Sequence, residues 1–143
     1  MGHQESIAQT DMPAPDAGAM DEKLATDWQE LLSVRESVLG EIEKARTAGR
    51  VKAPREAAAQ LRVHDGTASA LLKSRERQLS TIFGISRVDL VPESSGSGVA
   101  IAIDKTTGTK CARCWIYKSD IGVDKRWPDV CSRCAEALAA NRN

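Results

Sequence analysis

The last third of the chain contains Lys110-Cys-Ala-Arg-Cys114-Trp-Ile-Tyr117 and, further on, Pro128-Asp-Val-Cys131-Ser-Arg-Cys134. These stretches hold all 4 cysteines of the 143 residues, as two C-x2-C pairs with sixteen residues between them. Such spacing is typical of structural zinc sites, because one tight turn can aim both sulfurs of a pair at the same ion. We predict one zinc ion bound by Cys111, Cys114, Cys131 and Cys134. With four protein ligands no position remains for water or substrate, so its role should be structural.

Three other interpretations of the cysteines exist: two disulfides, an iron-sulfur cluster, or reactive C-x-x-C redox pairs. Disulfides are rare in a reducing compartment, and a redox motif would be expected next to a βαβ pattern that this region lacks. Thiolate ligands alone do not separate zinc from an iron-sulfur cluster.

The residues before the cysteines predict alternating helices and strands. Leu24, Trp28, Leu31, Leu32, Val38, Leu39, Ile42 and Ala45 form one apolar stripe in a helix over 21–48, with Asp21 as its cap and Gly49 at its end. We expect a strand over 57–63, a turn with a capping residue at 65–67, and one further helix to about residue 83. Strands over 87–91 and 98–103 should be joined by a loop over 92–97.

This order predicts an α+β fold, in which an amphipathic helix packs with a small sheet and a second helix, followed by a zinc ribbon with four cysteine ligands. We divide the chain into a linker or disordered lead-in (1–20), a small α/β domain (21–104) and the zinc finger (105–143). The start of the chain does not resemble a secretory signal, and no stretch approaches a membrane span. We therefore expect a soluble cytoplasmic protein.

Charge is distributed unevenly although the total is zero. Residues 1–43 carry a net charge of −8, residues 44–62 carry +5 and residues 105–143 carry +4. Basic residues interleaved with aromatics can bind phosphates and stack on bases. The candidate nucleic-acid contacts are Lys44, Arg46, Arg50, Lys52, Arg55, Lys110, Arg113, Tyr117, Lys118, Lys125, Arg126 and Arg133. Trp115, directly after a ligand, is expected to pack over the metal site as its small core, and Trp127 is equally compatible with core and surface.

The finger residues closely resemble the carboxy-terminal zinc finger of bacterial isoleucyl-tRNA synthetases. The resemblance includes Asp120-Ile-Gly-Val123 and the final Ala-Glu-Ala-Leu138, and upstream it extends to Trp28-Gln-Glu-Leu-Leu-Ser-Val-Arg-Glu-Ser-Val38 and Glu43-Lys-Ala-Arg46. It implies a zinc-binding appendage that contacts tRNA, specifically tRNA(Ile), and that works with the rest of a synthetase in cis or in trans. It also implies that the small α/β domain over 21–104 is of tRNA-binding type. The HIGH and KMSKS signatures of the class I catalytic domain are absent, so this chain alone is not expected to activate isoleucine.

Two other functions remain open at this stage. One is a free-standing zinc ribbon that binds nucleic acid without a role in aminoacylation, since the finger also resembles that of formamidopyrimidine-DNA glycosylases. The other is a zinc-stabilised interaction domain that binds no nucleic acid.

Overall fold

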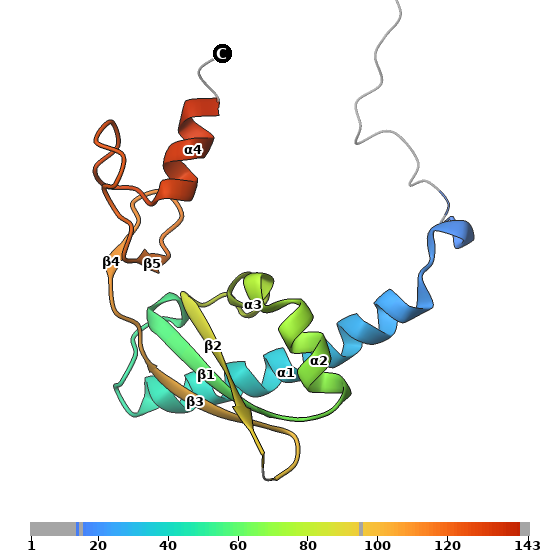
Figure 1. Cartoon of the computed structure of the whole chain (residues 1–143). Helices are drawn as coiled ribbons and strands as arrows, with labels where there is room; N and C mark the ends of the chain where they lie inside the picture. The colour runs from blue at the N-terminus through green and yellow to red at the C-terminus, as the bar shows by residue number, and fades with distance from the viewer. Residues whose placement is uncertain (1–13, 15, 95, 141–143) are drawn as a thin grey trace, which may run out of the picture.

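The computed structural model describes residues 14, 16–94 and 96–140, and it confirms the predicted α+β class (Figure 1). A three-stranded sheet packs against helices, and the cysteine-bearing finger follows at one end of this unit. Most of the expected lead-in over 1–20 lies outside the described residues; within it, Ala17–Ala19 form a short 3-10 helix.

The first helix, α1 (Glu22–Thr47), begins and ends where its signals predict. The Asp21 carboxylate accepts a hydrogen bond from the Leu24 N–H (2.9 Å), which satisfies one of the free donors of the first turn. At the other end Gly49 adopts φ 73°, and the Arg50 N–H donates to the Ala45 carbonyl at 2.9 Å. This is a Schellman-type ending, in which glycine supplies the left-handed residue.

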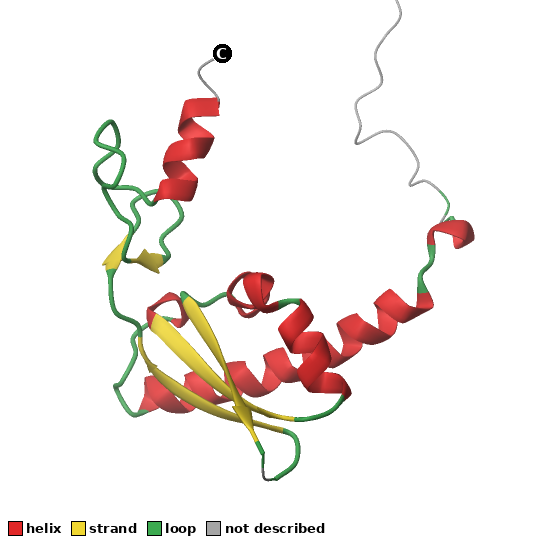
Figure 2. Ribbon diagram, viewed as in Figure 1, coloured by secondary structure: helices red, strands yellow, loops and turns green. Residues whose placement is uncertain are grey.

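The central strand of the sheet is β1 (Ala57–His64), between β2 (Arg87–Glu93) and β3 (Val99–Lys105) (Figure 2). β1 pairs in parallel with β2 and antiparallel with β3. Its side chains alternate strictly, since Leu61 and Val63 are buried whereas Gln60 and Arg62 are exposed. One face of the sheet therefore carries the core and the other faces solvent.

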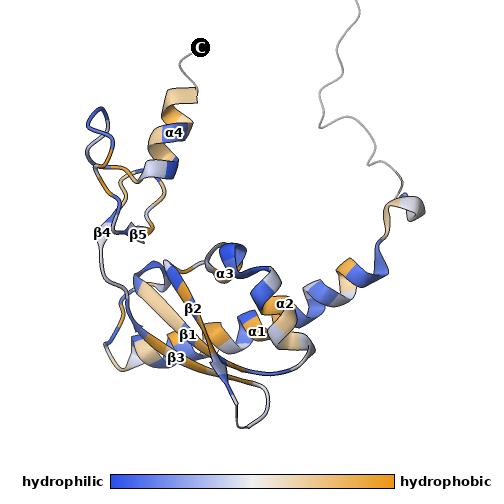
Figure 3. Ribbon diagram, in the orientation of Figure 1, coloured by the Kyte–Doolittle hydropathy of each residue, from blue (hydrophilic) through white to orange (hydrophobic). Residues whose placement is uncertain are grey.

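The core lies between that buried face and the helices α1, α2 (Thr67–Ser74) and α3 (Glu76–Phe83). Figure 3 shows apolar colouring along parts of β1 and β3, the strands that contribute side chains to this core. Its largest fully buried side chains are Val38, Val51, Leu61, Val63, Leu72, Leu79, Phe83 and Ile85. In the described part of the chain, no helix is long and apolar enough to cross a membrane.

Three details of the sequence-based prediction are wrong. The expected single helix ending near Phe83 is two helices, because Arg75 (φ −109°, ψ 10°) leaves the helical conformation between α2 and α3. The turn before α2 provides no side-chain cap, since Gly66 occupies the N-cap position. Pro92, expected in a loop, lies within β2, where its missing N–H is tolerated because β2 is an edge strand.

The apolar stripe of α1 is only partly buried. Leu31, Val38, Ile42 and Ala45 lie in the core, whereas Leu24, Trp28 and Leu32 are 42%, 43% and 46% exposed. The predicted apolar stripe is therefore buried mainly in the second half of α1, and Leu31 is its first buried member.

Two adjacent leucines provide a test of this packing. Leu31→Ala should lower the free energy of unfolding by about 2–5 kcal/mol, because it leaves a cavity in the core. Leu32→Ala, at an exposed position, should cost less than about 1 kcal/mol. Urea denaturation followed by circular dichroism measures both, and equal losses would contradict the burial described here.

Candidate metal centre

The first cysteine pair lies in a tight turn between two short strands, β4 (Thr109–Lys110) and β5 (Tyr117–Lys118). The Cys111 N–H donates to the Ile116 carbonyl (3.0 Å), and the Trp115 N–H donates to the Cys111 carbonyl (2.9 Å). Trp115 has φ 64°, the one left-handed non-glycine residue among those described. A left-handed tryptophan is costly, so the surrounding turn must hold it.

The second pair lies at the start of α4 (Ser132–Ala140). Asp120 fixes this helix end, because the Ser132 N–H (3.3 Å) and the Ser132 hydroxyl both donate to its Oδ2. The hydroxyl contact, together with the N–H, lowers the pKa of Asp120 even though burial opposes ionisation. An ionised carboxylate at a helix N-terminus also interacts favourably with the helix dipole.

The four sulfurs meet at one point. All lie within 4.8 Å of one another, and Cys111, Cys131 and Cys134 are almost completely buried. A tetrahedral zinc site with Zn–S bonds of about 2.3 Å places its sulfurs about 3.8 Å apart. The Cys114 and Cys131 sulfurs are 3.9 Å apart. The donor set and spacing therefore fit one structural zinc ion, as predicted.

The ionisation of the thiols shows why a cation is needed. Burial opposes ionisation of Cys111, but the N–H groups of Cys114, Cys131 and Arg113 outweigh it and lower the pKa of Cys111 to about 6. Burial and the three neighbouring sulfurs raise the pKa of Cys131 to about 12. The cluster thus favours a first thiolate and resists a full set of four. A bound divalent cation removes that resistance.

The metal centre forms a second small core, separate from that of the sheet. Val130 and Ala135 are buried beside the cysteines, and Ile121, Trp127 and Leu138 pack against them. Trp115, expected in this position, is instead 58% exposed, with the Lys110 ammonium 5.4 Å from its ring centroid. Trp127 therefore supplies the packing that sequence reasoning assigned to Trp115.

Three hydrogen bonds that involve side chains join the finger to the sheet unit. Arg55 Nη1 donates to the Cys114 carbonyl at 3.1 Å, and the Tyr117 hydroxyl donates to Glu56 Oε1 at 3.4 Å. Ser86 bridges the two parts: its hydroxyl donates to the Arg55 carbonyl (2.5 Å) and accepts from the Tyr117 N–H (2.9 Å). We call the turn that holds Cys111 and Cys114 the first knuckle. Its backbone, through the Cys114 carbonyl and the Tyr117 N–H, anchors it to the sheet unit.

Two clefts of about 440 Å³ each flank this junction. Lys110, Trp115 and Arg55 line the first, and Arg87 and Lys118 line the second. Tyr117 belongs to both.

The basic residues of the finger lie on its surface or at the junction. Arg113 approaches the Cys134 sulfur (3.9 Å). Arg126 is paired with Asp124 (2.7 Å) and also stacks on Trp127, its guanidinium 4.7 Å from the ring centroid. Lys125 contacts the Gly122 carbonyl (3.4 Å), and Arg133 is exposed on α4.

The basic residues before the sheet are engaged in contacts of their own. Lys44 and Arg46 form ion pairs with Glu41 and Glu43, each at 2.7 Å. Arg50 donates to the Ile103 carbonyl (2.6 Å) and Arg55 to the finger, whereas the Lys52 side chain is exposed. The expected patch over 44–55 is thus partly neutralised.

Sequence reasoning missed three residues that shape the site. Ser86 gave no signal, and Asp120 entered only through the family resemblance with no role assigned, because their roles depend on contacts that only the folded chain creates. Gly122 could have been singled out as a turn residue: it has φ 73°, and a Cβ there would lie 2.7 Å from the Pro128 carbonyl oxygen.

Metal removal provides a test of the two separate cores. Elemental mass spectrometry of the purified protein should find one zinc ion per chain. Chelation, or Cys131→Ser, should abolish the protection of amides in 109–140 from hydrogen exchange while leaving β1 protected, because the metal orders only the finger core. A finger that keeps its protection without metal would contradict this assignment.

Asp120 should matter for metal retention although it is not a ligand. Asp120→Ala removes the group that holds the start of α4, and such supporting groups typically change metal affinity about 10- to 100-fold. We expect zinc to transfer to a chromogenic chelator at least about tenfold faster at neutral pH. Asp129→Ala is the matched control at an exposed acid, and it should leave the transfer rate unchanged.

Comparison with known proteins agrees with this geometry. Residues 108–137 match the family described as "Zinc finger found in FPG and IleRS". The isoleucine–tRNA ligase of Geobacter sulfurreducens is 37% identical over 126 residues, 82% of this chain and 14% of that protein. Those of Desulforudis audaxviator and Aquifex aeolicus are 34% and 36% identical, each over 94% of this chain, or 15% and 14% of their own lengths.

The chain thus spans about one-seventh of the length of the curated relatives it matches. Both the upstream α/β unit and the finger fall within these alignments, and the four cysteines lie inside the matched finger family. The chain therefore corresponds to the carboxy-terminal, zinc-finger-bearing region of isoleucine–tRNA ligases.

Proposed function

We propose that this chain is the tRNA-contacting, zinc-ordered part of an isoleucine–tRNA ligase and supports aminoacylation of tRNA(Ile) in the cytoplasm. It works with the remainder of such a ligase, in cis or in trans, and the chemistry of aminoacylation lies in that remainder. The observation that carries the proposal is the exposed Trp115 with Lys110 over its ring, held outward by a zinc knuckle that is itself anchored to the sheet.

An exposed aromatic beside a cation is suited to nucleic acid. A base can stack on the indole face while the ammonium contacts a phosphate. The two clefts beside Tyr117 carry further cations, Arg55 on one side and Lys118 on the other. Backbone phosphates of a single RNA strand could therefore be contacted on both sides of the junction.

The contributions of the predicted contacts should differ. Lys110, Lys118 and Arg133 belong to the finger and are proposed as the main phosphate contacts. Arg113, Tyr117, Lys125 and Arg126 are held by contacts within the protein and should mainly shape the surface. Lys44 and Arg46 should add little, because Glu41 and Glu43 already pair with them.

Filter binding of labelled tRNA(Ile) tests the proposal. Binding should weaken steeply as salt rises, and chelation of zinc should reduce it at least about tenfold. The variant Lys110→Gln/Lys118→Gln/Arg133→Gln should lower the salt slope by about 0.7–0.9 for each phosphate that the variant no longer neutralises. The matched control Lys44→Gln/Arg46→Gln should bind almost as the natural chain does. Unchanged binding after complete zinc removal would overturn the proposal.

A second candidate function is binding of duplex DNA, since the matched finger family also includes FPG proteins. Competition between tRNA(Ile) and duplex DNA in the same assay separates the two: preference for the duplex would favour the second function. Binding of neither would favour an interaction domain without nucleic acid.

A further inference from the structure

The first half of α1 carries an apolar stripe that no residue in 14, 16–94 or 96–140 buries. Leu24, Trp28 and Leu32 follow one another at intervals of four residues and are 42%, 43% and 46% exposed. Met20, just before the helix, is 75% exposed. We call these four residues the α1 stripe. Exposed apolar side chains are ordinary when scattered, but a row of them marks an interaction site.

The geometry of the stripe suits a helical or grooved protein surface. Residues four apart form a ridge along a helix, and such ridges pack into the grooves of a second helix. Leu31, on the same side of α1, is buried, so the stripe continues the direction of the core face. Figure 1 shows the first turns of α1 extending beyond α2, and Arg75 and Gln78 line a hollow with Leu24 and Trp28.

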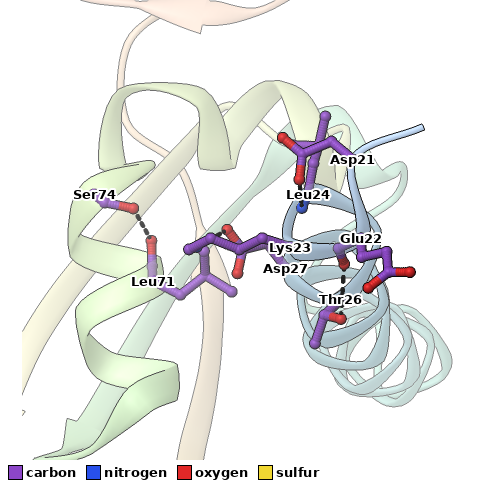
Figure 4. A network of polar contacts seen from close by, with 8 residues as sticks. All are labelled: Asp21, Glu22, Lys23, Leu24, Thr26, Asp27, Leu71 and Ser74. Atoms are coloured by element: carbon purple, nitrogen blue, oxygen red, sulfur yellow. Dashed lines mark hydrogen bonds and ion pairs between the residues drawn. The ribbon is translucent and has the colours of Figure 1, made fainter. Parts of the chain in front are cut away.

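The segment of α1 that carries the stripe is acidic. Residues 21–36 contain Asp21, Glu22, Asp27, Glu30 and Glu36 against Lys23 and Arg35, a net charge of −3. Arg75, which lines one hollow with Leu24, Asp27 and Trp28, reduces this charge to −2. Lys23 is paired with Asp27 at 2.7 Å, on the side of α1 toward α2 in Figure 4, and Arg35 Nε donates to the Ile82 carbonyl at 3.0 Å. Both basic residues are therefore already engaged within the chain.

This charge selects among possible occupants. A polyanion such as tRNA would be repelled by this acidic segment. A second copy of the chain would bring two acidic segments together, which is unfavourable. A protein surface with an apolar groove and basic edges is complementary to the stripe on both counts.

We propose that the α1 stripe docks into such a groove on the remainder of an isoleucine–tRNA ligase. This inference rests on the proposed partnership with that remainder. The relatives support it, since the segments matching this chain make up only 14–15% of their lengths. In those proteins a large body of other polypeptide is available to cover the stripe.

Hydrogen exchange at residues 20–34 tests the docking. We would compare the free chain with a chimera of the Geobacter sulfurreducens ligase in which the matching segment is replaced by this chain. Exchange should be at least about tenfold slower in the chimera, because the helix is covered. The variant Leu24→Gln/Trp28→Gln/Leu32→Gln should remove that protection in the chimera and leave exchange in the free chain unchanged.

A matched control alters the opposite side of the same helix: Gln29→Ala/Ser33→Ala/Ser37→Ala should retain the protection. Equal exchange in the free chain and the chimera, or an unaffected stripe variant, would overturn the proposal. A stripe variant that also destabilises the free chain would show that the stripe packs within this chain, and would overturn it equally. If the chimera does not fold, the aligned helix of the natural full-length ligase is measured instead; exchange there as fast as in the free chain would be decisive against docking.

Light scattering measures the molar mass of the free chain in solution and so tests whether the chain self-associates. A dimer that the stripe variant dissociates would assign the stripe to a second copy and overturn the proposal. None of these measurements contains tRNA, so a failure of docking is distinguishable from a failure of tRNA binding.

Discussion

The structure of the finger depends on bringing four cysteine sulfurs together in a site with little solvent, where their thiolates repel one another. The N–H groups around Cys111 favour one thiolate, but each further ionisation brings negative charge into a site with little solvent, as the raised pKa of Cys131 shows. A divalent cation attracts all four thiolates and so offsets their mutual repulsion. Folding of the finger is therefore coupled to metal binding. The apolar core around the cysteines is small, with Val130 and Ala135 as its other fully buried members, and would give little stability by itself.

The finger core that the metal orders is joined to the sheet unit at the first cysteine pair. The carbonyl of Cys114, itself a ligand residue, accepts the hydrogen bond from Arg55, and Tyr117 begins the contact with Ser86 and Glu56. The geometry of the knuckle thus sets the position of the two junction clefts. The finger contributes backbone groups to two of these contacts, the Cys114 carbonyl and the Tyr117 N–H, whereas the sheet unit contributes the side chains of Arg55 and Ser86. A surface assembled in this way can hold an aromatic ring outward without burying it, as Trp115 illustrates.

Local patterns in the sequence were sufficient where a feature depends on neighbouring residues. The cysteine spacing, the alternation in β1 and the caps of α1 at Asp21 and Gly49 were all predictable on that basis. The break at Arg75 was not, because neither proline nor glycine marks it. Nor were the exchange of roles between Trp115 and Trp127 and the bridging by Ser86, since each depends on which distant segments meet. Local rules also treated the basic residues as free charges, whereas several have acidic or carbonyl partners.

The two ends of the described chain differ in the chemistry that they present. Near the finger, cations surround an exposed aromatic ring, whereas the start of α1 combines apolar side chains with acidic residues. One surface cannot serve both purposes, because the acids that disfavour RNA at the first end would weaken phosphate contacts at the other. Their placement at opposite ends of the fold, as Figure 1 shows, would allow the proposed protein partner and the proposed RNA to bind at the same time. The sheet unit between them is then the spacer that fixes their separation, and its rigid core is what makes that separation definite.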